Sequence, residues 1–390
     1  MEQWKEYKLG EVVNILDYKR VPLSSKERST RKGLYPYYGA QGIIDYIDDY
    51  IFDGTYLLIA EDGENLKSQK QNVAQLASGK YWVNNHAHIV ESNGKSDIRY
   101  ICFLLNMMDL SGYITGSAQP KLNQANLASI PLQLPSLGVQ KKIADFLSVF
   151  DDKIKVNRRI NDNLEQQAQA LFKSWFVDFE PFKEGEFVES ELGMIPKGWR
   201  VMSLTNIANY TNGLAMQKFR PNNKDKGLPV LKIKELGQGS FDSSCDRCSS
   251  LIEEQFKVNN GDIIFSWSGT LLVDIWCGGI CGLNQHLFKV TSKEFPKWFY
   301  YMWTKEHLRN FIHIANDKAV TMGHIKRGHL EEAKVLVPVS EEFYKMTRII
   351  QPIIEVIIEK KIENLKLSIV RDTLLPHLMS GELKVNDVTI

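Results

Sequence analysis

A long internal repeat is the sequence feature that most constrains the fold of this chain. Three segments return further along the sequence: residues 4–12 as 199–207, residues 84–86 as 284–286, and residues 134–135 as 337–338. A helical pattern follows the proline of the last pair in both copies. Repeats in solenoid arrays are about 20–50 residues long, so this longer repeat indicates a duplicated domain.

The composition fits a protein with ordinary folded domains. A length of 390 residues predicts two or three domains, and 43% hydrophobic residues allow each repeat its own core. The sequence has no run of 18 apolar residues, and its first ten residues do not resemble a signal peptide. We therefore expect a soluble, cytoplasmic protein.

We divide the chain into two globular units, each followed by a long helix. Short apolar runs bounded by Gly and Asp predict strands in the first unit, and residues 98–108 predict a helix. The expected class is therefore α+β. The full division is 1–135, first unit; 136–176, first long helix; 177–198, a hinge containing Pro and Gly; 199–338, second unit; 339–380, second long helix; and 381–390, C-terminal tail.

Each long helix is predicted by one sustained apolar stripe, with Ser136 and Ser340 as candidate N-caps. At about 1.5 Å per residue, the first helix would be roughly 60 Å long. Pro352 lies inside the second helical pattern, so we expect a kink or a broken first segment there. The stripe residues expected to pair are Phe150, Ile154, Ile160, Leu164, Leu171, Ile354, Ile357, Ile362, Leu365 and Ile369.

The two stripes are most simply buried against each other. The chain must run out along one helix and back along the other, which predicts an antiparallel coiled coil. The two globular units would then be related by a pseudo-twofold axis, one at each end. Asn157 on the stripe would fix the register at some cost in stability. The alternative is that each helix packs on its own unit. A unit of this size has a radius of gyration of roughly 14 Å, which is too small to cover the full length of such a stripe.

Basic side chains gather at equivalent places in the two repeats. The net charge is only +1, but residues 19–32 and residues 218–234 each carry six Lys or Arg against a single acidic residue. An acidic stretch at residues 178–191 offsets them. Clustered Lys and Arg are expected where a protein contacts phosphate groups. The alternative is that each cluster is a solvated loop. The repetition at matched positions strengthens the interpretation as a binding site, but the solvated loop stays possible.

The common catalytic motifs are absent from the sequence. It has no Walker A motif, no GxGxxG after a strand, no HExxH, no GxSxG and no kinase set. It also lacks an Asn-Pro-Pro-Tyr or Asp-Pro-Pro-Tyr tetrapeptide, so we do not expect it to methylate base amino groups. No catalytic residue and no bound cofactor are predicted.

Four of the five cysteines have the spacing of metal ligands. Cys245 with Cys248, and Cys277 with Cys281, would suit a structural zinc site. The first repeat has only Cys102, and Cys281 has apolar neighbours, among which reduced cysteine packs as a small hydrophobe. We therefore predict no metal site, and no disulfide in a cytoplasmic chain.

Loops rich in cations and amides are the candidate readers of DNA bases. Asn and Gln can bind adenine through two hydrogen bonds, and Arg or Lys can bind guanine. The matched segments 84–86 and 284–286 are better explained as structural turns. If each repeat read its own stretch of DNA, the two stretches would normally differ in sequence, and so would the residues that read them. The predicted DNA-binding residues are Lys19, Arg20, Lys26, Arg28, Arg31, Lys32, Lys67, Gln69, Lys70, Ser117, Gln119, Lys121, Lys218, Arg220, Lys224, Lys318, Thr321, His324, Lys326 and Arg327.

Three segments resemble those of the specificity (S) subunits of Type I restriction-modification systems. They are LFKSWFVDFEPF at residues 171–182, ELGMIPKGW at residues 191–199, and LLPHLMSGEL at residues 374–383. The order of unit, helix, unit and helix extends the resemblance over the whole chain.

The resemblance implies that each unit is a target recognition domain for one half of a bipartite, gapped site in double-stranded DNA. The helices would set the spacer and dock two methyltransferase (M) subunits, which carry S-adenosylmethionine and the catalysis. Restriction (R) motor subunits would complete the enzyme, with ATP also on partner subunits. The target adenine would be flipped into a partner, leaving this chain non-catalytic and without a cofactor of its own.

Two other functions remain open at this point. A stand-alone, two-headed DNA-binding regulator would need no methyltransferase, but lone DNA binders usually carry a strong basic excess. A fused methyltransferase-nuclease would need the catalytic motifs that the sequence lacks.

Overall fold

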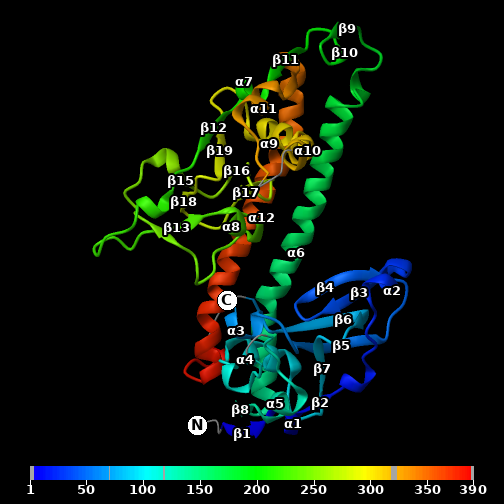
Figure 1. Cartoon of the computed structure of the whole chain (residues 1–390), viewed down its shortest axis with the longest axis vertical. Coiled ribbons are helices and arrows are strands. Elements are labelled where there is room, and N and C mark those ends of the chain that lie inside the picture. The colour runs from blue at the N-terminus through cyan, green and yellow to red at the C-terminus, as the bar shows by residue number, and fades with distance from the viewer. Residues whose placement is uncertain (1–3, 70, 117–118, 318–322, 388–390) are drawn as a thin grey trace. The chain divides into compact units, whose positions relative to one another are not determined.

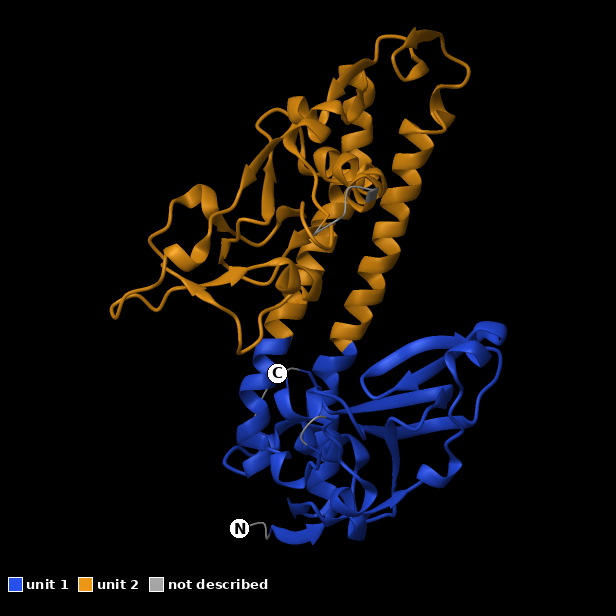
Figure 2. Cartoon of the chain, viewed as in Figure 1, with its two compact units in different colours: residues 1–152, 368–390 blue, residues 153–367 orange. Residues whose placement is uncertain are grey.

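The structure is a computed structural model that describes residues 4–69, 71–116, 119–317 and 323–387. It contains two compact units, one of residues 1–152 and 368–390 and the other of residues 153–367 (Figure 2). The division falls inside both long helices, α6 (Leu137–Phe176) and α12 (Ser340–Ser380), so each unit holds a segment of both. Helices and mixed sheets make up both units, which confirms the α+β class.

Unit 1 is built on a six-stranded sheet (Figure 1). Its order is β2 (Val13–Ile15), β7 (Ala87–Ser92), β5 (Phe52–Ala60), β6 (Ala74–Val83), β3 (Lys32–Gly39) and β4 (Gly42–Ile47). Neighbours are antiparallel except β3 and β6, which are parallel. The remaining elements are the pair β1 (Lys5–Lys8) and β8 (Pro131–Leu134) and the helices α1 (Leu9–Val12), α2 (Ser25–Thr30), α3 (Asn65–Ser68), α4 (Ile98–Met107) and α5 (Gln124–Ser129).

Strand β5 shows why this sheet is buried on both faces. Side chains alternate between the faces of a strand. Leu57 and Ile59 pack into the cluster that contains α4 and the unit 1 segments of both long helices. Leu58 instead packs against Phe52 and Tyr81 in a separate cluster.

Unit 2 holds two four-stranded sheets. The first is antiparallel and has the order β12 (Asn209–Asn212), β19 (Leu287–Thr291), β16 (Asp262–Ser266) and β17 (Leu272–Trp276). The second has the order β14 (Arg247–Cys248), β13 (Leu228–Leu231), β18 (Cys281–Leu283) and β15 (Lys257–Val258), and its β13 and β18 are parallel. The remaining elements are the pairs β9 (Phe187–Ser190) with β10 (Gly193–Pro196) and β11 (Arg200–Ser203) with β20 (Lys334–Val337), and the helices α7 (Leu204–Ile207), α8 (Ile233–Gln238), α9 (Lys297–Glu306), α10 (Leu308–Asp317) and α11 (Arg327–Glu332).

The duplication seen in the sequence is present in the strand pairing. The order β2-β7-β5-β6 of unit 1 corresponds to β12-β19-β16-β17 of unit 2. Leu57 pairs with Val90 as Ile263 pairs with Val290, which fixes the equivalent positions of the two units. The copies differ where the continuous strand β6 is replaced by two shorter strands, β17 and β18.

The long helices run antiparallel within each unit. In unit 2, Asn157 Nδ2 donates to Glu363 Oε2 at 3.0 Å and Asn161 Nδ2 donates to the Ile357 carbonyl at 3.3 Å. In unit 1, Arg371 forms an ion pair with Asp151. The contact positions on α12 fall as those on α6 rise, which confirms the predicted antiparallel pairing.

The buried seam of α6 differs in one respect from the predicted apolar stripe. Ile154, Asn157 and Asn161 are buried, whereas Ile160 is 37% exposed. Positions 154, 157 and 161 are three and four residues apart and share one helix face, and Ile160 points elsewhere. The buried position after Asn157 is occupied by the polar Asn161. The prediction counted only apolar residues and therefore chose the adjacent Ile160.

Other predicted pairing residues have mixed environments. Phe150, Ile354 and Ile357 are buried. Leu164, Leu171 and Ile362 are partly buried against the core of unit 2, and Leu365 is partly exposed. Ile369 is 56% exposed, so the structure does not bring it into the seam.

Pro352 does not break α12, which is helical from Ser340 to Ser380. The broken first segment expected there is therefore wrong. Proline removes one backbone hydrogen bond and crowds the preceding turn. Ile350 and Ile354, on either side of it, are both fully buried in the core of unit 2, and this packing holds the helix together.

Candidate nucleic-acid interface

Most cations of the first basic cluster, residues 19–32, are held by carboxylates. Helix α2 carries part of this cluster and begins after Ser24, whose hydroxyl accepts the Glu27 N–H. The pairs are Arg20 with Glu61 at 2.5 Å, Arg28 with Asp45 at 3.2 Å, Arg31 with Asp48 at 2.9 Å, and Lys32 with Asp45 at 2.6 Å. Neutralised cations of this kind hold the loop in place and contribute less to attraction of DNA.

Lys19 and Lys26 are the exposed cations that remain in this cluster. Neither forms an ion pair within the part of the chain that the structure describes. The ammonium of Lys19 lies 5.8 Å from the ring centroid of Tyr18, which is itself 78% exposed. An exposed aromatic ring beside a cation is a common platform for bases and sugars. Tyr18 is not among the DNA-binding residues predicted from the sequence, although its place beside Lys19 could have indicated it.

The other candidate residues of unit 1 have different environments. Lys67 and Gln119 are exposed. Gln69 has a left-handed backbone (φ 45°), and its Nε2 donates to the Met108 carbonyl at 2.9 Å. Lys121 pairs with Glu61 at 3.1 Å. Lys70 and Ser117 lie outside the described residues.

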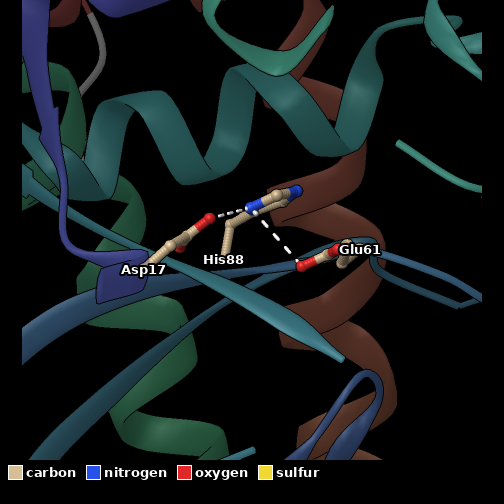
Figure 3. Close-up of side chains that lie close together, drawn as sticks. All are labelled: Asp17, Glu61 and His88. Atoms are coloured by element: carbon tan, nitrogen blue, oxygen red, sulfur yellow. Dashed lines mark hydrogen bonds and ion pairs between the residues drawn. The ribbon is translucent and has the colours of Figure 1, made fainter. Parts of the chain in front are cut away.

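A buried charge network lies at one end of β5 and β7. His88 stands between the carboxylates of Asp17 and Glu61, with its Nδ1 2.5 Å from Asp17 and 3.9 Å from Glu61 (Figure 3). The ligand atoms of these three residues lie within 4.8 Å of one another, so they could in principle hold a metal ion.

The hydrogen bonds of this network do not fit a metal site. His88 Nε2 lies 2.7 Å from the Leu122 carbonyl, which can only accept, so this nitrogen carries a proton. Nδ1 faces the Asp17 carboxylate, and both oxygens of Glu61 are engaged by Arg20 and Lys121. Burial alone would raise the pKa of Asp17, but the hydrogen bond and charge of His88 lower it below its ordinary value. The network is therefore an internal set of ion pairs.

Unit 2 has aromatic residues at the equivalent positions. By the strand register, Glu61 and His88 correspond to Trp267 and Phe288. The ring centroids of Trp267 and Phe288 are 5.8 Å apart, and Trp267 Nε1 donates to Asn212 Oδ1 at 2.9 Å. The two units thus share strands and differ in the chemistry at their ends.

The basic loop of unit 2 is more open than that of unit 1. Lys218, Arg220 and Lys224 are exposed and form no ion pair within the described ranges. The loop is shaped by Asp225, which accepts from Ser249 Oγ at 2.7 Å. This hydrogen bond, with others from Ser250 and Gly227, lowers the pKa of Asp225.

A polar pocket of about 290 Å³ opens beside this loop. Arg220 comes from the loop, Lys232 follows β13, and Gln285 and His286 come from the turn before β19. Lys232 pairs with Asp246 at 2.5 Å on the pocket wall. Three segments that are distant in the sequence therefore bring cations and amides together.

The loop before α11 brings a further set of candidates. His324 is exposed, and its ring lies 6.4 Å from that of Trp267. Lys326 and Arg327 are exposed at the start of α11. Lys318 and Thr321 lie outside the described residues.

The matched turns have the structural role that their repetition suggested. Asn84 Oδ1 accepts the His86 N–H at 2.8 Å, and Asn284 Oδ1 accepts the His286 N–H at 3.3 Å. The asparagine therefore closes the turn in both units, which leaves the intervening residue free to differ.

Three of the four cysteines with ligand-like spacing, Cys248, Cys277 and Cys281, are buried among apolar side chains, and Cys245 is partly exposed. Cys248 and Cys281 are fully buried, and burial raises the pKa of both thiols. Cys245 Sγ lies 3.3 Å from the Asp246 carbonyl. A cysteine binds zinc as the thiolate, so a raised thiol pKa disfavours metal binding. Over the described ranges, no group of three potential metal ligands includes a cysteine.

Comparison with known proteins identifies the family. The model of the Type I restriction modification DNA specificity domain matches residues 1–166 and 196–367, one match for each repeat. The chain belongs to this family. The family predicted from the sequence is thereby confirmed.

Curated relatives and a solved structure agree with the family match. The chain is 32% identical to the MjaIX specificity subunit of Methanocaldococcus jannaschii over 304 residues, which are 74% of this chain and 70% of that protein. It is 22% identical to the HindI specificity subunit of Haemophilus influenzae, with 98% and 100% of the two chains covered. The S subunit of a Type I system from M. genitalium has the same fold, with a TM-score of 0.57, 16% identity and coverage of 97% and 96%. In the described part of the chain, no helix is both long and apolar enough to cross a membrane.

Proposed function

We propose that this specificity subunit reads a bipartite, gapped DNA sequence, with one half-site assigned to each recognition domain. The observation that carries the proposal is the duplication of one strand framework with different side chains at equivalent positions. Glu61 and His88 of unit 1 are replaced by Trp267 and Phe288 in unit 2. Two copies of one scaffold with different loop chemistry are suited to two related sites of different sequence.

The long helices would set the distance between the half-sites and dock two M subunits. Their antiparallel pairing, with Asn157 and Asn161 in a buried seam, supports a spacer of defined register. We assign S-adenosylmethionine, ATP and all bond-making steps to the M and R subunits. The closed ion pairs around His88 agree with this division, because they leave that group of residues no open position for chemistry.

Methylome sequencing tests the proposal. The chain and its M partner are expressed in cells that lack other modification systems, and each subunit is also expressed alone. A gapped motif methylated only when both are present is the expected result. Unchanged methylation with both subunits expressed and associated would contradict the proposal, and tight DNA binding by the chain alone would then favour a stand-alone DNA-binding protein.

A further inference from the structure

We propose that the polar pocket of unit 2 reads the edge of a purine base in the half-site assigned to that unit. Among the residues that line it, we assign base contact to Gln217, Arg220 and Gln285. The inference rests on the proposed function and adds the residues and the class of base. It also separates base-reading residues from the many surface cations that could only contact phosphates.

The side chains of the pocket fall into two groups. Lys232 is neutralised by Asp246 at 2.5 Å, and Arg247 donates to the carbonyls of Lys226 and Gly227 at 2.9 and 2.7 Å. These residues form the framework. Gln217 and Arg220 are exposed and make no hydrogen bond or ion pair within the described residues. Gln217 is therefore available to a ligand. Arg220 is available as well. The hydrogen bond and charge of Lys232 lower the pKa of Asp246, and the charge of Arg220 adds to this effect.

Gln285 supplies an unmatched acceptor. Its Oε1 is shielded from solvent and has no hydrogen-bond partner among the described residues. Its Nε2 has only a long contact of 3.4 Å with His286 Nε2. Shielded polar atoms without partners are rare in folded proteins, and each one calls for a partner. A donor on a bound base would satisfy this oxygen after a small rotation of the side chain.

The chemistry of the pocket selects purines. A carboxamide both donates and accepts, which matches N7 and N6 of adenine. A guanidinium offers two parallel donors, which match N7 and O6 of guanine. Phosphate contacts carry no sequence information, and a phosphate oxygen cannot donate a hydrogen bond. The unpartnered acceptor Gln285 Oε1 therefore indicates a donor on a base.

The equivalent place in unit 1 is built differently. The matched turn has Asn85 where unit 2 has Gln285. Arg20 of unit 1 donates to the carbonyls of Asn85 and Ala87 at 3.3 and 3.0 Å and is tied to Glu61. A residue that differs inside a turn shared by both units is expected where the two halves of a target sequence are distinguished.

The test uses the chain assembled with its M subunits and measures methylation of a library that varies every base of the recognised motif. Gln285→Ala and Arg220→Ala are expected to lower the discrimination at one position of one half-site by at least about fivefold. The other half-site and the gap should not change. Arg200→Ala, which removes an exposed arginine on β11 outside the pocket, is the matched control and should keep the wild-type motif.

Each alternative outcome is distinguishable. A wild-type motif for both pocket variants would overturn the inference and leave the proposed function intact. An equal loss at all positions would indicate phosphate contact and would also overturn it. If the alanine variants fail to assemble, Gln285→Glu and Arg220→Lys replace them, because they keep the size or the charge of the side chain and change its hydrogen-bond pattern. An unchanged motif or an equal loss at all positions would again overturn the inference. Absence of a gapped motif for the wild-type complex would instead refute the proposed function.

Discussion

Glu61 is the carboxylate on which the charges of unit 1 converge. Arg20, Lys121 and His88 approach it from the first basic cluster, the loop before α5 and strand β7. Burial raises its pKa, and the hydrogen bonds and charges of these neighbours overcome that effect and lower it. The network therefore joins two segments of the candidate DNA-binding surface, the first basic cluster and the loop of Lys121, to the ends of strands β5 and β7.

Removal of Asp17 from this network is expected to destabilise unit 1. Asp17→Asn removes the carboxylate that faces the buried His88 ring and pairs with Arg20, and the loss of a partner from a buried pair typically costs about 3 kcal/mol. Asp48→Asn breaks the exposed pair with Arg31 and should cost about 0–1 kcal/mol. Urea denaturation at pH 7 measures the free energy of unfolding of both variants. Equal losses would show that the buried network stabilises unit 1 no more than an exposed ion pair does.

The pH dependence of stability follows from the lowered pKa values of Asp17 and Glu61. Because these values lie below those of the unfolded chain, about 3.9 and 4.3, the network stabilises the fold at higher pH. The contribution is lost as the pH falls below about 4 and through the folded values. Asp17→Asn should have a smaller loss of stability over this range than the wild-type chain, and parallel pH profiles would show that other carboxylates dominate.

At the scale of single elements, the seam of the long helices decides which substitutions matter. Ile357 is fully buried and Ile369 is 56% exposed, although both lie on the stripe predicted from the sequence. Ile357→Asp should destabilise unit 2 by at least about 4 kcal/mol, because it removes a buried side chain and buries an unpaired charge. Ile369→Asp is the control on the same helix and should cost less than about 0.5 kcal/mol. Similar thermal shifts for the two variants would contradict the observed seam.

The sequence predicted the helices well because their signal is local. The prolines and the spacing of three and four residues place α6 and α12 nearly as observed, although Ser340 is the first residue of α12 and not its N-cap. The register of the seam was harder to predict, because polar Asn161 occupies a buried position that apolar periodicity does not mark. The ion pairs of Arg28 and Arg31 with β4 and the residues after it were also out of reach, since they depend on strands that pair through tertiary contacts.

An insertion in both long helices tests their role as a spacer. Seven residues added to α6 and to α12 at facing positions, such as after Lys155 and before Lys366, preserve the seam because the period of its pattern is seven. The contact of Asn157 with Glu363 then stays on one side of both insertions. Each helix lengthens by about 10 Å, so the gap in the methylated motif should grow by two to three base pairs at about 3.4 Å per pair. The half-sites themselves should not change. An unchanged gap in an assembled, active complex would refute the spacer role.

At the scale of the whole molecule, the two units share a framework, and their cores reach beyond the segments that the repeat delimits. Ile143 and Leu147 of α6 and Leu378 of α12 belong to the core of unit 1. The sequence repeat places the end of the first unit at residue 135, but side chains from both long helices complete its packing. Only the folded chain reveals this dependence, because residues 143 and 378 share no local signal.

This packing determines how a domain exchange should be made. Replacing residues 1–135 with the corresponding segment of another specificity subunit should change one half-site and leave the other half-site and the gap intact. The donor must carry apolar residues that fit Ile143, Leu147 and Leu378, since a mismatch would leave cavities in the core of unit 1. The reciprocal exchange of residues 199–338 is the control and should change only the opposite half-site. Methylome sequencing reads both, and a change in both half-sites from a single, stably assembled exchange would contradict the independence of the two recognition domains.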